Sequence, residues 1–161
     1  MYINTKNLMK VGITCSTFDL LHTGHILMLE ECKQHCDYLI CALQVDPTLD
    51  RPEKNKPIQS VVERYTQLKA VKYVDEIIPY VTEIELEEIF KSYPINARII
   101  GSDYMGRDFT AKEICRDRGI EIIYNKRDHD YSSTELRKRV WRVETSKIEY
   151  YKKLNAEEPQ K

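Results

Sequence analysis

The stretch Thr14-Cys-Ser-Thr-Phe-Asp-Leu-Leu-His-Thr-Gly-His25 decides the fold, because it joins an apolar run to an amphipathic segment. The apolar run is Lys10-Val-Gly-Ile-Thr14, and the amphipathic segment extends from Ile26 to Cys36. This succession predicts a strand, a turn and a helix. In α/β sheets such turns lie at the carboxyl edge, where helix N-termini bind anions. We therefore expect the functional site at this turn.

Two histidines, His22 and His25, stand on either side of Gly24 where the predicted helix begins. Both imidazoles can point at one anion held by the helix, and the glycine lets the backbone approach it closely. A His-x-x-His pair alone is more often a surface pair or half of a metal site. The segment Thr17-Phe18-Asp19 just upstream favours a catalytic site instead.

Four further apolar runs of strand length alternate with helical patterns along the chain. The strands are expected at 37–44, 73–79, 97–101 and 120–124, and the helices at 60–71, 82–93, 110–118 and from 132 onward. Five strands alternating with helices predict a single-domain, Rossmann-like, doubly wound sheet of five parallel strands in the order 3-2-1-4-5, with helices on both faces.

The chain of 161 residues is long enough to form one domain with a buried core and no disulfides. We expect a lead-in at residues 1–9, the α/β domain at residues 10–145, and a polar tail at residues 146–161. The tail either extends the last helix or frays. No internal repeat or second domain is expected.

Composition narrows the expected partners and location. The 25 Lys and Arg residues balance 26 Asp and Glu residues, so no overall field favours nucleic acid or an anionic membrane. Five cysteines without a secretory signal or a membrane-length apolar run indicate a reducing, cytoplasmic environment. Cys32 and Cys36 could form part of a metal cluster, but packing on one helix face is the more economical interpretation, since zinc sites usually need four ligands.

Polar residues follow several predicted strands at the same edge of the sheet. Lys56 and Arg64 follow the second strand, and Asp103 follows the fourth. The fifth is followed by Arg127, Ser132, Ser133 and Thr134. Because hydrogen-bond donors and cations predominate, the ligand should be rich in phosphate. Only five glycines are present, and they form no phosphate-binding loop, dinucleotide-binding turn or serine-hydrolase elbow.

The segment from Ser16 to His25 resembles the signature G-T-F-D-x-x-H-x-G-H of cytidylyltransferases in the HxGH nucleotidyltransferase superfamily. Ser16 replaces the first glycine, which strains the chain if that position needs a positive φ. The segment from Arg127 to Thr134 resembles a second signature, R-T-x-G-I-S-T-T, with departures at Asp128, Asp130 and Tyr131.

Two spacer segments strengthen the resemblance, which covers about residues 11–140. Tyr73-Val-Asp-Glu-Ile-Ile-Pro79 is similar to Y-V-D-E-V-I-P of bacterial glycerol-3-phosphate cytidylyltransferases, and Gly101-Ser-Asp-Tyr-Met-Gly-Arg107 is similar to their G-D-D-W-x-G-K. The implied reaction transfers CMP from CTP to a phosphorylated alcohol such as glycerol 3-phosphate. It releases pyrophosphate by direct in-line displacement.

The resemblance also implies roles for individual residues. The catalytic residues are His22, His25, Lys56 and Arg127, and Lys56 and Arg64 hold the acceptor phosphate. The nucleotide contacts are Thr17, Phe18, Asp19, His22, His25, Asp103, Arg127, Ser132, Ser133 and Thr134. Mg²⁺ is expected, on Asp19 or Asp103, with no organic cofactor.

The expected partners are CTP, a small phosphorylated alcohol and a second copy of the chain, and neither nucleic acid nor a membrane is expected. Two alternatives stay open: an adenylyltransferase of the same superfamily that uses ATP, and a catalytically silent nucleotide-binding relative. The identity of the alcohol is the least determined part of the prediction.

Overall fold

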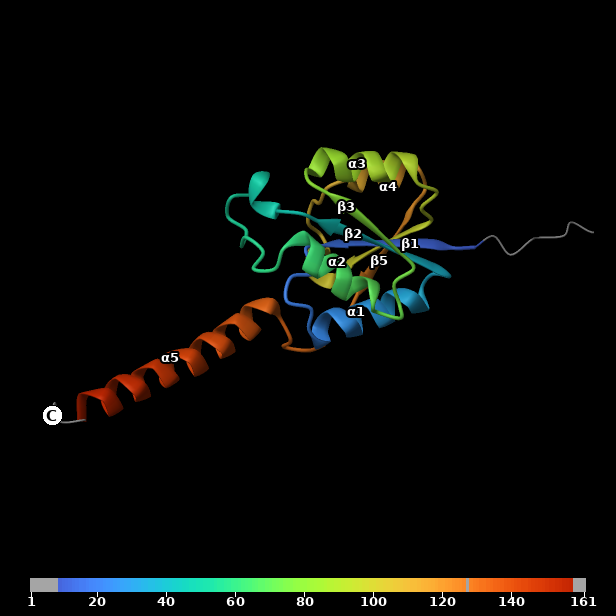
Figure 1. The fold of residues 1–161 in the computed structure, drawn as a ribbon. Coiled ribbons are helices and arrows are strands. Elements are labelled where there is room, and N and C mark those ends of the chain that lie inside the picture. Colours follow the sequence, from blue (N-terminus) through green and yellow to red (C-terminus); the bar gives the residue numbers. More distant parts are fainter. Residues whose placement is uncertain (1–8, 127, 158–161) are drawn as a thin grey trace, which may run out of the picture.

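The computed structural model describes residues 9–126 and 128–157 and contains the five-stranded sheet that the sequence predicts (Figure 1). All strand pairs are parallel, and the order is β3-β2-β1-β4-β5. The strands are β1 (Val11–Ser16), β2 (Tyr38–Gln44), β3 (Glu76–Tyr80), β4 (Ala97–Gly101) and β5 (Glu121–Asn125). The predicted fold class and strand order are confirmed.

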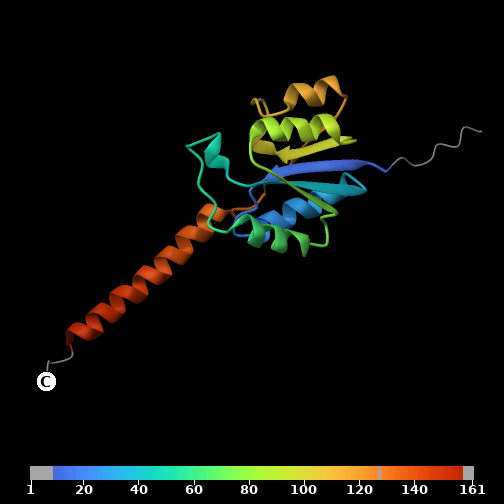
Figure 2. The same cartoon turned by 45° about the horizontal axis from the view of Figure 1, so that its top comes forward.

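Four helices cover the two faces of this sheet: α1 (Thr23–Gln34), α2 (Val61–Lys69), α3 (Glu83–Ser92) and α4 (Lys112–Asp117). A fifth helix, α5 (Ser133–Glu157), projects away from the sheet (Figures 1 and 2), and single 3-10 turns lie at Pro47–Leu49 and Ser102–Tyr104. Helices α1 and α2 lie on one face, and α3 and α4 lie on the other (Figures 1 and 2). This division follows from right-handed crossovers, because the chain winds first toward β3 and then toward β5.

The side chains of the central strands alternate between two hydrophobic clusters, one on each face. Ile13 and Ile40 pack with Phe90 of α3 on one side, while Leu39 packs with Leu29 of α1 on the other. All five of these side chains are almost fully buried. Alternation of this kind is expected for strands buried on both faces. The two clusters hold the sheet edge rigidly in place.

The winding direction reverses at β1, which pairs with β2 on one side and with β4 on the other. Connections leave the carboxyl ends of β1 and β4 in opposite directions, so a crevice opens between them. The segment that follows β1 enters this crevice.

Some element boundaries differ from those expected. Helix α1 begins at Thr23 instead of Ile26, because His22 caps it. Helix α5 continues as far as Glu157, so the described part of the tail extends the last helix. Of the expected lead-in, residues 1–8 lie outside the described residues. Within 9–126 and 128–157, no helix is long and apolar enough to cross a membrane.

Candidate active site

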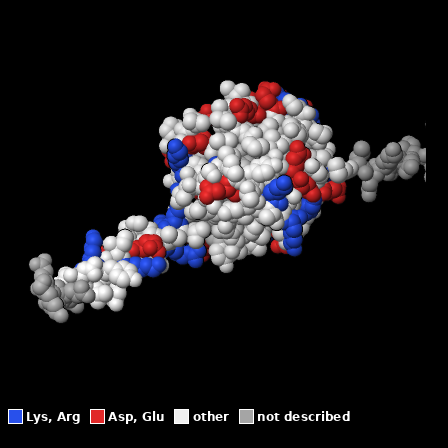
Figure 3. Space-filling view, in the orientation of Figure 1, with Lys and Arg blue, Asp and Glu red and all other residues white. Residues whose placement is uncertain are grey.

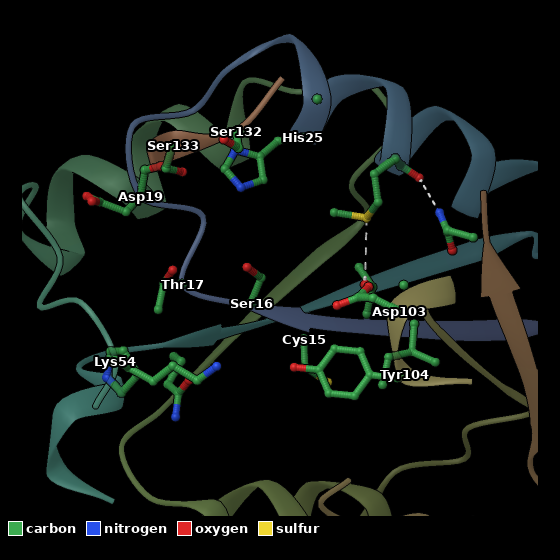
Figure 4. Close-up of a pocket in the computed structure, with 18 of the residues that line it drawn as sticks. Cys15, Ser16, Thr17, Asp19, His25, Lys54, Asp103, Tyr104, Ser132 and Ser133 are labelled. Atoms are coloured by element: carbon green, nitrogen blue, oxygen red, sulfur yellow. Dashed lines mark hydrogen bonds between the residues drawn. The ribbon is translucent and has the colours of Figure 1, made fainter. Parts of the chain in front are cut away.

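A cavity of about 680 Å³ occupies the crevice at the carboxyl ends of the strands (Figure 4). Its walls come from the turn after β1, the segments after β2, β4 and β5, and the first turn of α5. The expected site residues that line it are Thr17, Asp19, His22, His25, Asp103, Ser132, Ser133 and Thr134. Residues more than 100 positions apart in the sequence therefore meet in one cavity.

The two histidines lie together at the N-terminus of α1. Their rings stack with centroids 4.0 Å apart, and the Phe18 ring lies 5.6 Å from that of His25. Nδ1 of His22 accepts a hydrogen bond of 3.0 Å from the backbone N–H of Gly24, which caps the helix. An accepting Nδ1 places the proton of a neutral imidazole on Nε2. His22 can therefore cap α1 and donate a hydrogen bond from its other ring nitrogen.

The turn that carries this site holds two residues in the left-handed region, Phe18 (φ 49°) and Leu20 (φ 51°). Such conformations cost free energy in residues other than glycine, and they persist where surrounding contacts enforce them. Ser16 has no positive φ and ends β1 as a strand residue. The replacement of the signature glycine by Ser16 therefore introduces no strain of this kind.

The segment after β5 packs directly on the turn after β1. A Cβ on Gly24 would lie 2.8 Å from Cε1 of His129 and 2.8 Å from the carbonyl oxygen of Tyr131, closer than side chains allow. The glycine is thus needed for this contact. Ser132 accepts a hydrogen bond from the N–H of Glu135 and so caps α5 at the cavity. The resulting open helix end can receive an anion.

Asp19 is a buried carboxylate, 4% exposed, that joins three parts of the site. Its oxygens accept hydrogen bonds from the backbone N–H groups of Ile58 (3.1 Å) and Gln59 (2.9 Å) and from the Arg137 guanidinium (2.6 Å). Burial by itself would raise the pKa of Asp19, but the donors from Gln59, Ile58 and Arg137 outweigh it and lower the pKa below its usual value. Because its oxygens are occupied in this way, Asp19 fits a structural role better than a magnesium site.

Arg64, expected at the acceptor phosphate, contacts backbone carbonyl groups in this structure. This side chain is 2% exposed and is not among the side chains that line the cavity. Its guanidinium donates to the backbone carbonyls of Thr17, Gln44, Val45 and Gln59 at 2.6 to 3.1 Å. Burial lowers the pKa of Arg64 from its ordinary value, and the carboxylates of Asp19 and Asp46 oppose that shift. The hydrogen bonds of Arg64 hold the ends of β1 and β2 together.

Lys56 lies outside the cavity lining in this structure. Its side chain is 80% exposed, with Nζ 3.9 Å from the Asp46 carboxylate. Lys54, from the same segment after β2, lines the cavity on the side opposite His25 (Figure 4). Sequence reasoning missed Lys54, although its place between strand end and helix gave the same signal as that of Lys56.

A second group of polar residues, also missed from the sequence, lines the cavity near α3. The Arg51 guanidinium lies 3.0 Å from the Glu83 carboxylate and donates to the side-chain oxygen of Gln44 at 2.9 Å. Arg98, 4% exposed, lies between the rings of Phe90 and Phe109, with centroid distances of 4.7 and 4.6 Å. This wall offers both cationic and anionic groups to a ligand with phosphate and hydroxyls.

The donor set limits how a metal ion could be held. Within the described ranges, no group of three or more His, Cys, Asp or Glu side chains is placed to bind one. Mg²⁺ needs only one or two carboxylates when substrate phosphates supply its other ligands. Asp103, which lines the cavity beside Tyr104 (Figure 4), fits that requirement better than Asp19 does.

The segment after β5 contributes one expected and one unexpected residue. Arg127, expected at the nucleotide, lies outside the described residues. His129 lines the cavity next to Gly24 and Tyr131, with its ring 5.4 Å from that of Tyr131. It occupies the variable position of the second signature, so the sequence gave no reason to select it.

Comparisons with known proteins identify the family of this chain. The model of the Cytidylyltransferase-like family matches residues 13–139. A glycerol-3-phosphate cytidylyltransferase of Bacillus subtilis (strain 168) is 33% identical over 132 residues, which cover 82% of this chain and 98% of that protein. The corresponding protein of Staphylococcus aureus (strain NCTC 8325 / PS 47) is 31% identical over 133 residues, 83% of this chain and 96% of its own.

A solved structure supports the same assignment of fold. The lipopolysaccharide core biosynthesis protein from Thermoplasma volcanium GSS1 superposes with a TM-score of 0.60 at 25% identity, covering 78% of this chain and all of its own. The fold and site thus define an α/β nucleotidyltransferase. The chain belongs to the Cytidylyltransferase-like family.

Replacing Arg64 with Ala should destabilise the protein, because four backbone carbonyl oxygens lose their buried donor. We expect the free energy of unfolding in urea to fall by about 3 kcal/mol or more. The control Arg116→Ala removes only an exposed arginine and should cost less than about 1 kcal/mol. If Arg64→Ala has normal stability but binds substrate more weakly, Arg64 contacts the substrate and this prediction is wrong.

Asp19→Asn should lower stability in a pH-dependent way. The folded-state pKa of Asp19 lies below its unfolded value, so its carboxylate stabilises the fold above about pH 4 and loses this effect as the pH falls. At pH 7 the free energy of unfolding should drop by about 1 to 3 kcal/mol. The difference in free energy of unfolding between Asp19→Asn and the wild type should become smaller below pH 4. A difference that stays the same from pH 7 to pH 3 would contradict this prediction. The control is Asp117→Asn, which changes an exposed carboxylate.

Proposed function

We propose that this nucleotidyltransferase transfers CMP from CTP to glycerol 3-phosphate, releasing pyrophosphate. The observation that carries the proposal is the pair His22 and His25 at the N-terminus of α1, facing the N-terminus of α5 in the same cavity. Two helix N-termini and two imidazoles form a site for a polyphosphate. The glycerol-3-phosphate cytidylyltransferases among the relatives support the choice of acceptor.

The reaction needs no nucleophile from the protein. An oxygen of the acceptor phosphate is already negatively charged at neutral pH, and it attacks the α-phosphorus of CTP. The new P–O bond forms as the bond from the α-phosphorus to the bridging oxygen breaks, and the electron pair leaves with pyrophosphate. The protein therefore acts by positioning the two phosphates and neutralising their charge.

Each side chain then has a defined task in this proposal. His22 and His25 donate hydrogen bonds to triphosphate oxygens, and His25 stabilises the charge that grows on the leaving pyrophosphate. The backbone of Thr17 and Phe18 contacts the α-phosphate. Phe18 acts through its backbone alone, since its side chain is fully buried.

The start of α5 holds the nucleotide from the opposite wall. Ser132, Ser133 and Thr134 supply hydroxyl and backbone N–H donors, and Arg127 contacts the base. Asp103 would hold either the ribose or a Mg²⁺ ion. When bound, Mg²⁺ neutralises phosphate charge.

The acceptor lies toward the segment after β2 and α3. Lys54 lines that side, and Lys56 reaches the reacting phosphates when its segment closes. Cationic Arg51 and Arg98 disfavour an acceptor with a trimethylammonium group, and Glu83 can accept hydrogen bonds from hydroxyls. A small polyol phosphate meets both requirements.

His25→Ala should reduce kcat by about 10² to 10³-fold, the usual effect of removing one transition-state donor. Its thermal midpoint should stay near that of the wild type. His35 provides a matched control, since it lies at the other end of α1 and outside the cavity lining. Full turnover in His25→Ala, or an equal loss in His35→Ala, would remove His25 from the mechanism.

A pyrophosphate-release assay should show CTP preferred over ATP, and glycerol 3-phosphate preferred over phosphocholine, phosphoethanolamine and sugar phosphates. Arg127→Ala should narrow the CTP preference by roughly 10 to 150-fold, because a base contact worth about 1 to 3 kcal/mol is lost. A preference for ATP, or an unchanged nucleotide preference in Arg127→Ala, would overturn the assignment of cytosine recognition. Turnover of phosphocholine above glycerol 3-phosphate would overturn the assignment of the acceptor.

A further inference from the structure

Helix α5 extends well beyond the part of the chain that matches the family. The family match ends at residue 139, while α5 continues to Glu157. Its first turn belongs to the cavity, through Ser133, Thr134 and Arg137. The rest projects away from the sheet and its covering helices (Figures 1 and 2). This projecting part, residues 140–157, has no task in the reaction described above.

The projecting part carries large apolar side chains in solvent. Their exposed fractions range from 46% for Leu154 to 69% for Trp141, and the set comprises Val140, Trp141, Val143, Ile148, Tyr150, Tyr151 and Leu154. Residues other than Lys, Arg, Asp and Glu cover much of the visible face of the projecting part, with basic and acidic residues beside them (Figure 3). A helix without tertiary packing has little stability in water. These seven side chains, the apolar stripe of α5, therefore need another surface to cover them.

The spacing of four of these residues indicates the kind of surface; Trp141, Ile148 and Tyr151 lie outside that series. Starting from the half-buried Leu136, the series Leu136, Val140, Val143, Lys147, Tyr150 and Leu154 advances alternately by four and three residues. This is the heptad repeat of a coiled coil, with Leu136, Val143 and Tyr150 at d and the others at a. A single lysine at an a position is a known device that fixes register and the number of strands.

Charges within the stripe favour a protein partner over a lipid surface. Glu144 and Lys147 form an ion pair of 2.9 Å next to the apolar side chains. Insertion of this face into the hydrocarbon of a lipid bilayer would remove water from both charges, which costs considerable free energy. A second helix can instead place opposite charges beside them.

We propose that α5 pairs with α5 of a second copy in a parallel, two-stranded coiled coil. In this register Arg139 at g faces Glu144 at e of the second copy, five positions further on, and symmetry makes the contact twice. An antiparallel pair through the same residues would place Glu144 opposite Glu144 and Arg139 opposite Lys153. Charge complementarity thus selects the parallel arrangement, which puts both cavities at the same end of the coiled coil.

The first experiment locates the contact in the full-length protein. Val140→Cys introduces a thiol at an a position, and mild oxidation should link two chains into a covalent dimer. Thr145→Cys, at an f position on the opposite side, should stay unlinked under the same conditions. Equal linking of both variants, or no linking of Val140→Cys, would overturn the proposal.

The second experiment measures mass by sedimentation equilibrium at micromolar concentration. Val143→Asp should halve the mass of the assembled species, whereas Thr145→Asp should leave it unchanged. Circular dichroism checks that the α/β domain is still folded in each variant. Unchanged mass for Val143→Asp would overturn the proposal even if another surface also joins copies.

The third experiment tests the register through a charge exchange. Arg139→Glu and Glu144→Arg should each weaken assembly, and the double variant should return it to the wild-type level. A double variant that assembles more strongly than wild type indicates an antiparallel pair and overturns the parallel arrangement. Binding to vesicles of phosphatidylglycerol and phosphatidylcholine, by a protein that sediments as a single chain without them, would assign the stripe to a lipid surface and overturn the proposal.

Discussion

The arrangement of the site depends on the hydrogen bonds and the ion pair that the buried carboxylate of Asp19 forms. Its backbone lies in a turn with two left-handed residues, and its side chain binds the end of the segment after β2 and the first turns of α5. The same residue accepts a hydrogen bond from Ser133 at its carbonyl oxygen, at 3.0 Å. Asp19 thus joins a tight turn, a long loop and a helix end at one point.

Arg64 stabilises the same arrangement through hydrogen bonds to backbone carbonyl groups. It binds carbonyl groups at the ends of β1 and β2, so the turn above it has a fixed base. The opposite charges of Arg64 and Asp19 are both shielded from solvent, and neither needs to contact substrate to matter for catalysis. Phosphoryl transfer depends on how the reacting phosphates are positioned. Arg64 and Asp19 fix the backbone segments that carry the side chains of the cavity.

The sequence predicted much of the fold because its signals are local. Apolar runs separated by helical patterns identified the strands, and the handedness of crossovers left few ways to order them. The histidine pair was found because both residues stand in one short stretch with a specific motif. By contrast, the roles of Arg64 and Asp19 depend on what surrounds them after folding, and a cation near a strand end can face substrate or backbone.

The wall formed by Gln44, Arg51, Glu83 and Arg98 was missed for a related reason. Its members come from four separate segments, and each is unremarkable in its own surroundings in the sequence. Their meeting depends on the register of β2, β3 and β4, which periodicity does not supply. The length of α5 was similarly undetermined, since its polar and charged residues are compatible with a helix or with a frayed end.

The contact between Ser133 and Asp19 spans 114 positions of the sequence, and the Arg137 contact spans 118. During synthesis, the ribosome delivers the histidine motif early and the first turn of α5 last among the parts of the cavity. A nascent chain can therefore bury both faces of its sheet while the α5 side of the cavity is still missing. The cavity gains its wall from Ser132, Ser133 and Thr134 only after the start of α5 has been synthesised.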